Sequence, residues 1–237
     1  MKHMKIALAA MLAVVMGTTF TSCLNSDRDD VNYAYVTINT SMGIITSLTT
    51  DDGYELVPQN ASQMTLDGSI PKRAYIAFKL LEGEKLSSNS SARVSFVDYY
   101  DILYVRDMSD GLVETATRLL AISQDIWSAN GYLNVAAAYY SYTVDSPDDF
   151  SLYIDRIEDN TIYFKLAFTK EVEETSTYSA KSLSYILPSE EEIKESYPAA
   201  LIPDSNGYYN AVLIADGVNS SGDEVELKSN TSKIALP

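Results

Sequence analysis

Residues 124–143, QDIWSANGYLNVAAAYYSYT, decide the fold class of the second half of the chain. Asn130-Gly131 is a dipeptide typical of a two-residue β-hairpin turn. Trp127 precedes the turn, and apolar residues follow it at alternate positions from Leu133 onward. Such alternation is typical of a strand with one buried face. The stretch therefore predicts a hairpin, with Trp127 in the core between two sheets.

The rest of the second half repeats this pattern. Residues 150–170 predict another hairpin with its turn at 158–160, and residues 177–188 and 207–228 predict further strands. About seven strands with regular turn signals are typical of an immunoglobulin-like β-sandwich, which we expect over residues 116–237.

One short helix interrupts the strands near residues 189–197. Ser189 and Glu192 have the spacing of a capping box, and Glu190 and Lys194 form an i,i+4 pair. Pro198 limits its length. The sequence therefore predicts a single helix in a fold that is otherwise all-β.

The first half predicts a smaller β-domain over residues 33–115. Its first strand alternates apolar and polar residues from Ala34 onward, and Asp52-Gly53 marks a hairpin turn. Five strands with a bend near residues 98–101 suit an OB-like five-stranded barrel.

The N-terminus has the order of a secretory signal peptide. Lys2 and Lys5 precede an apolar run at residues 6–16, and small residues follow up to Cys23. A membrane-spanning helix needs about 20 apolar residues, more than this run contains. We therefore expect a signal peptide over residues 1–22.

The residues before Cys23 resemble a bacterial lipobox. That resemblance implies cleavage between Ser22 and Cys23 and attachment of fatty chains, such as palmitate, to Cys23. Two chains suffice for stable membrane anchoring. The expected location is the cell envelope, with the lipid in the outer membrane, and residues 23–32 as a flexible acidic tether.

Three acids in the tether resemble a surface-export signal of the same kind of lipoprotein: Asp27, Asp29 and Asp30. The alternative is an ordinary solvated tether, with the protein facing the periplasm.

The composition limits the kinds of catalytic, metal and ligand site that the chain can form. The chain has one His and one Cys, and His3 is lost with the signal peptide, as are two lysines, so the formal charge falls from −16 to −18. Without imidazole or a free thiol, Ser-His-Asp and Cys-His catalysis and ordinary zinc sites are excluded. The negative charge argues against nucleic acid, and no Gly-rich phosphate loop indicates a nucleotide. We expect no catalytic residues, no metal and no cofactor.

Several segments together resemble the NigD-like lipoproteins of anaerobic Gram-negative gut and oral bacteria. They are the signal ending at Cys23, VDYYDILYVRDM at 97–108, DIWSANGYLNVAAAYYS at 125–141 and DFSLYIDRIEDNTIYFKLAF at 149–168. The segment 186–209 is an insertion not expected in shorter members. The resemblance implies an N-terminal OB domain and a C-terminal immunoglobulin-like domain, but it implies no biochemical activity.

Tyrosine is the unusual residue, with 18 copies against one Trp and six Phe. Its apolar ring and polar tip suit sugar stacking and protein interfaces, although in strands it also packs against cross-strand neighbours. Adjacent tyrosines point to opposite faces, so at most one of each pair lies in the core. Clusters occur at Tyr33/Tyr35 and at three adjacent pairs. The candidate ligand-binding residues are Tyr99, Tyr100, Tyr139, Tyr140, Tyr208 and Tyr209.

The expected function is non-enzymatic binding of an envelope protein or a glycan. One alternative is a structural or bacteriocin-associated envelope component. Another is a glycoside hydrolase that uses two carboxylates, for which Asp98 and Asp101 are the nearest pair. Calcium at Asp51/Asp52 or at Asp145/Asp148/Asp149 is weighed against the preference of turns for Asp.

Overall fold

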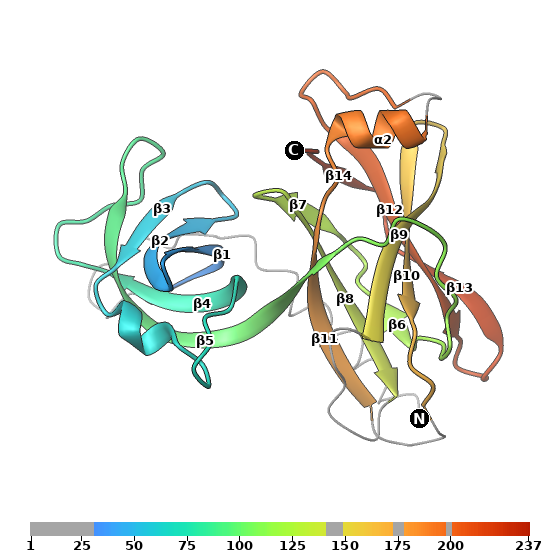
Figure 1. The fold of residues 1–237 in the computed structure, drawn as a ribbon, viewed down its shortest axis with the longest axis horizontal. Helices are drawn as coiled ribbons and strands as arrows, with labels where there is room; N and C mark the ends of the chain where they lie inside the picture. Colours follow the sequence, from blue (N-terminus) through green and yellow to red (C-terminus); the bar gives the residue numbers. More distant parts are fainter. Residues whose placement is uncertain (1–30, 141–148, 173–177, 198–200) are drawn as a thin grey trace. The chain divides into compact units, whose positions relative to one another are not determined.

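The computed structural model describes residues 31–140, 149–172, 178–197 and 201–237 (Figure 1). These residues form two compact units, one ending at Val105 and the other starting at Arg106. The sequence placed this boundary at residue 115. The difference arises because Ser109 already belongs to the second unit, where its amide donates a hydrogen bond of 2.8 Å to the Leu152 carbonyl.

The first unit is a five-stranded barrel, coloured blue to green in Figure 1. Its strands are β1 (Asn32–Ser41), β2 (Ile44–Thr50), β3 (Glu55–Pro58), β4 (Arg73–Leu80) and β5 (Ala92–Asp107). They lie in the order β3-β2-β1-β4-β5, and a parallel pairing of β3 with β5 closes the barrel. The predicted five-stranded OB-like barrel is confirmed.

Alternation along β1 sorts its side chains between the inside and the outside of the barrel. Ala34, Val36 and Ile38 are buried in the barrel core, whereas Tyr35 and Thr37 between them face outward and are half-buried. A 3-10 turn, η1 (Ala61–Met64), lies between β3 and β4, and its fully buried Met64 belongs to the same core. The outer face of β1 is therefore free to carry polar and aromatic groups.

The turn that joins β1 to β2 has an unusual residue. Met42 and Gly43 both have positive φ, 51° and 77°, as a two-residue turn of type I′ requires. Asn or Gly normally occupies the first of these positions, yet here it is Met42, whose side chain is fully exposed.

The second unit contains two sheets. The first contains β6 (Ala121–Ile122), β7 (Trp127–Ala129), β8 (Tyr132–Tyr140) and β11 (Tyr178–Ile186), with β8 pairing the other three. The second contains β9 (Phe150–Glu158), β10 (Thr161–Phe168), β12 (Tyr209–Val218), β13 (Glu224–Lys228) and β14 (Ser232–Ile234). In the second sheet β10 and β12 run parallel, which the sequence did not indicate.

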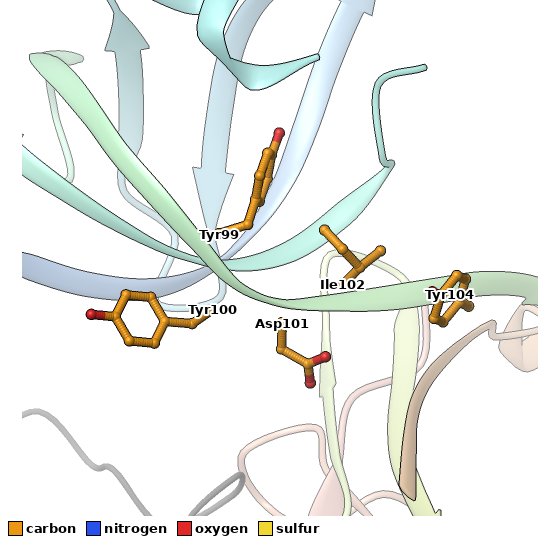
Figure 2. Close-up of a pocket in the computed structure, with 5 residues that line it drawn as sticks. All are labelled: Tyr99, Tyr100, Asp101, Ile102 and Tyr104. Carbon is orange, nitrogen blue, oxygen red and sulfur yellow. The ribbon is translucent and has the colours of Figure 1, made fainter. Parts of the chain in front are cut away.

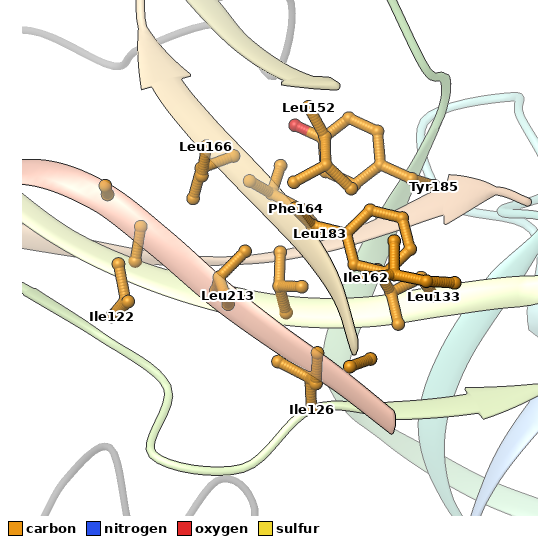
Figure 3. Close-up of a cluster of buried hydrophobic side chains, with 14 of the residues drawn as sticks. Ile122, Ile126, Leu133, Leu152, Ile162, Phe164, Leu166, Leu183, Tyr185 and Leu213 are labelled. Carbon is orange, nitrogen blue, oxygen red and sulfur yellow. The ribbon is translucent and has the colours of Figure 1, made fainter. Parts of the chain in front are cut away.

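One hydrophobic core lies between the two sheets and confirms the predicted sandwich (Figure 3). Leu133 and Leu183 enter it from the first sheet and Phe164 and Leu213 from the second, and all four are fully buried. The prediction for Trp127 was wrong. It is half-buried and is not part of this core, because the preceding Ile126, 3% exposed, takes the inward position.

The predicted turns and helix of the second unit are confirmed. Asn130 and Gly131 both have positive φ, 52° and 81°, as the type I′ turn requires. The helix α2 (Glu190–Ser196) begins with the Ser189–Glu192 capping box in full, and Lys194 pairs with Glu190. Within the described ranges, no helix combines the length and apolar character that crossing a membrane requires.

Candidate binding surface

Four tyrosines from three strands gather on the outer face of the barrel, and we call them the tyrosine face: Tyr33, Tyr35, Tyr75 and Tyr100. The pairing register explains why they meet. Tyr75 on β4 lies directly opposite Tyr35 on β1, and Tyr33 lies one outward position further along β1. Tyr100 joins them from β5.

The four rings differ in orientation. The ring of Tyr75 lies 4.6 Å from that of Tyr35 and 6.2 Å from that of Tyr33, with interplanar angles of 33° and 30°. The Tyr100 ring stands nearly upright to them, at 83° to Tyr33 and 73° to Tyr75. Its hydroxyl and that of Tyr33 share a long hydrogen bond of 3.4 Å. Three tilted rings thus form one wall, and Tyr100 forms a second wall across it.

A small residue lies beneath this corner. Ala77 on β4 pairs with Tyr33 on β1 and with Asp98 on β5, so no large side chain fills the row between them. Ala77 itself is 1% exposed. The rings of Tyr33 and Tyr100 therefore meet above β4 in an edge-to-face contact, with their centres 5.1 Å apart.

Two irregularities in β5 turn Tyr100 outward. Between Phe96 and Asp98, and again between Tyr99 and Asp101, β5 has one residue more than β4. Such bulges re-aim side chains and are frequent beside functional sites. The extra residue of the second bulge is Tyr100, which is 61% exposed.

Figure 2 shows the result along β5. Tyr99 and Ile102 project from one side of the strand, whereas Tyr100 and Asp101 project from the other. Together with Tyr104 they line a shallow depression of about 290 Å³. Carboxylates follow this edge of the tyrosine face, with Asp98 exposed and Asp101 half-buried opposite Tyr75.

The opposite end of the face is held by a buried ion pair. Arg73 is fully buried, donates to Thr37 Oγ1 at 2.7 Å and bonds both carboxylate oxygens of Asp51. Asp51 is thus a structural anion in this structure, which argues against the calcium interpretation of Asp51/Asp52.

The surroundings shift the pKa values of the tyrosines. Burial, and then the negative charge of Asp101, raise the pKa of Tyr35 far above its usual value, while Arg73 acts in the opposite direction. The hydrogen bond with Tyr33 raises the pKa of the Tyr100 hydroxyl. The Tyr35 and Tyr100 hydroxyls are therefore neutral near pH 7, and the tyrosine face offers aromatic rings and hydroxyls beside carboxylates.

Three of the six predicted binding tyrosines point inward. Tyr139 and Tyr209 are 1% and 2% exposed in the sandwich core, so they cannot form a platform. Tyr99 packs against Phe96 in the barrel, donates to the Met64 carbonyl at 2.7 Å, and has its pKa raised to about 12 by burial. Because side chains alternate along a strand, the neighbour of each inward tyrosine is the exposed one.

The exposed members are Tyr100, Tyr140 and Tyr208. Tyr140 ends β8 and Tyr208 precedes β12, so both belong to the second unit, whereas the four tyrosines of the tyrosine face belong to the first. Sequence reasoning missed Tyr75, which has no adjacent tyrosine. Its only signal was an outward position on a predicted strand.

The predicted lipidation and export residues lie outside the described residues: Ser22, Cys23, Asp27, Asp29 and Asp30. Among the residues that are described, no three His, Cys, Asp or Glu side chains gather as a metal site. Asp98 and Asp101 are the carboxylates that the glycoside hydrolase alternative would use. Asp98 accepts a hydrogen bond of 2.8 Å from the Tyr99 amide, so its carboxylate has a local structural contact in β5.

Comparisons with known proteins are informative only at the level of the fold. No family model and no curated protein matches the chain. A solved structure of a "Putative lipoprotein" from Bacteroides fragilis NCTC 9343 is similar over 88% of this chain and 99% of its own, with 16% identity and a TM-score of 0.55. A protein of unknown function DUF1344 from Bacteroides vulgatus ATCC 8482 is similar over 88% and 92%, with 15% identity and a TM-score of 0.55.

A NigD-like immunity protein from Bacteroides caccae ATCC 43185 also matches, at 16% identity and a TM-score of 0.48, over 85% of this chain and 93% of its own. The Bacteroides fragilis and Bacteroides vulgatus structures span nearly their whole lengths in the match, so both the barrel and the sandwich are shared. The chain therefore has the fold of the Bacteroides fragilis and Bacteroides vulgatus structures, a barrel and a sandwich, as its sequence resemblance to the NigD-like family predicts.

Proposed function

We propose that this protein is a lipid-anchored component of the cell envelope that acts without catalysis, by binding an envelope protein or a glycan through the tyrosine face. The observation that carries the proposal is the meeting of Tyr33, Tyr35, Tyr75 and Tyr100 on one outer surface. Phe78 and Phe96 lie inside the barrel, where they bury apolar area, whereas these four rings lie outside. Rings placed outside, with polar tips, are typical of binding surfaces.

Two further observations support a binding role over a catalytic one. Neither His nor Cys occurs in residues 31–237, and the buried ion pair at one end of the face is used for structure. The envelope location rests on the signal order at residues 1–22 and on Cys23, and the Bacteroides fragilis protein with the same fold is itself named a "Putative lipoprotein".

The binding role is tested by photo-crosslinking. A benzoylphenylalanine residue replaces Tyr100 in one version of the protein and Tyr208 in another, and each is mixed with envelope extract and irradiated. Both positions are exposed, but only the first lies on the tyrosine face. We expect a defined adduct or, on a parallel glycan array, a defined glycan signal that Tyr100→Leu abolishes and Tyr208→Leu does not. Equal labelling from both positions, with a blank array, would contradict the proposal.

The anchor is tested separately. Cys23→Ser should release the protein from the membrane fraction and abolish palmitate labelling, whereas Ser26→Ala beside it should change neither. Membrane retention of the Cys23→Ser protein would contradict lipid anchoring and leave the binding proposal intact.

A further inference from the structure

We propose that the tyrosine face binds cationic groups, namely the lysine or arginine side chains of a basic polypeptide segment. This inference rests on the proposed function and names the chemistry of the partner. Two features of the face point to a cation: the exposed ring of Tyr100 and the carboxylates along the edge of the face.

The upright ring of Tyr100 suits a compact group better than a flat one. A sugar ring stacks on one flat aromatic platform, but here Tyr100 stands at 83° to Tyr33 and at 73° to Tyr75. A compact cation is attracted to the negative π surface of an exposed aromatic ring, and Tyr100, which is 61% exposed, offers such a surface.

The charges around the corner favour a cation as well. Asp98 and Asp101 lie on the β5 edge of the face, and the negative charge of Asp98 acts on the Tyr100 hydroxyl. The arginine at the other end, Arg73, has its charge offset by Asp51 at 2.9 Å. The whole chain carries a formal charge of −16, so an approaching basic segment is attracted over long distances.

The chain already makes this kind of contact elsewhere. On the outer side of the second sheet, the Arg156 guanidinium lies 4.2 Å from the centre of the Tyr163 ring, and Lys228 Nζ lies 5.2 Å from the same centre. Asp155 and Glu158 pair with Arg156 there. Tyrosine beside carboxylates thus holds basic groups in the sandwich, and the tyrosine face presents the same residue types to a partner.

The first test uses tetramethylammonium chloride as the probe and the full-length protein in detergent. We expect the ring signals of Tyr33 and Tyr100 in nuclear magnetic resonance spectra to shift with increasing tetramethylammonium. Sodium chloride at the same ionic strength should not shift them, and the Tyr208 signals should stay unchanged. Equal shifts with both salts would overturn the inference.

The second test uses a fluorescent peptide of alternating glycine and lysine, with a glycine–glutamine peptide as the uncharged control. Loss of one ring from an exposed cation–π contact should weaken binding roughly two- to fivefold, so Tyr100→Leu should bind the lysine peptide that much less tightly. Tyr100→Phe, which keeps the ring, should bind like the unchanged protein, and so should Tyr208→Leu. Asp98→Asn removes a negative charge beside the tyrosine face and keeps all four rings, and it should also bind the lysine peptide more weakly.

The outcomes separate the two proposals. Peptide affinities that are the same for Tyr100→Leu, Asp98→Asn and the unchanged protein overturn the cationic inference. If crosslinking through Tyr100 or a glycan signal persists in that case, the binding function stands with another partner. Thermal unfolding of every variant shows that a loss of binding is not a loss of the fold.

Discussion

The Nη2 atom of Arg73 donates hydrogen bonds to both carboxylate oxygens of Asp51, at 3.0 and 2.9 Å. Arg73 is completely buried, at one end of the tyrosine face. Removing the carboxylate leaves the guanidinium charge buried beside Thr37. We expect Asp51→Ala to lower the free energy of unfolding by about 3 kcal/mol, the usual cost of breaking a buried ion pair. Urea denaturation measures this change. Asp52→Ala, at the exposed neighbour, should cost less than about 0.5 kcal/mol, and equal losses for both variants would contradict the structural role of the pair.

The turn at Met42 should be improvable. A residue other than Gly or Asn in the left-handed region costs about 1 kcal/mol, and Met42 has φ of 51° with no contact to compensate, since its side chain is fully exposed. We expect Met42→Asn to raise the urea midpoint of unfolding, by roughly 0.5–1 kcal/mol in free energy. Met42→Val, with a β-branched side chain at the same φ, should lower it. An unchanged midpoint in both variants would show that the turn relaxes without cost.

Gly217 allows a test of close packing in the sandwich. A Cβ at this position would lie 2.3 Å from Leu227 Cγ and 3.0 Å from the Leu119 carbonyl oxygen. Gly217→Ala should therefore destabilise the protein by about 1–3 kcal/mol, and adding Leu227→Ala should recover part of that loss. Gly111→Ala is the matched control, because open space surrounds it. Additive losses in the double variant would mean that Leu227 is not the obstacle.

Acid should weaken the loop before β12 through Asp204. The backbone amides of Asn206 and Tyr208 donate hydrogen bonds to its carboxylate, which also forms an ion pair with Lys233 at 3.0 Å. These contacts lower the pKa of Asp204, and the hydrogen bond from the Tyr208 amide has the largest effect. A lowered pKa stabilises the fold above the unfolded value, about 3.9, and this contribution is lost as the pH falls through the folded value. The unfolding free energy of Asp204→Asn should therefore lie below that of the unchanged protein at pH 7 and approach it as the pH falls below about 4. A difference that stays constant over this range would contradict the assignment.

Local signals made much of the fold predictable. Asn130-Gly131 and the Ser189–Glu192 capping box depend on residues within four positions of one another, and both formed as expected. The alternation of apolar and polar residues in β1 was also sufficient to predict which of its side chains are buried, because a strand with one apolar face can turn only that face toward the core.

Long-range pairing made the rest unpredictable. Tyr75 joins the tyrosine face only because β4 lies between β1 and β5, and nothing near it in the sequence indicates those neighbours. The direction of Tyr100 depends on a bulge, which shifts the alternation by one residue. The pairing of Arg73 with Asp51 likewise required the register of the folded barrel.

The parallel pairing of β10 with β12 also bears on how the protein is made. Ile162 lies opposite Ala211, so the second edge of β10 stays unpaired until a segment nearly fifty residues further along the chain has folded against it. During that interval the β9–β10 hairpin has an open backbone edge, on which strands of other chains could assemble. Newly synthesised copies that crowd together at this stage would aggregate through β10, so protection of this hairpin during biosynthesis should govern the yield of soluble protein.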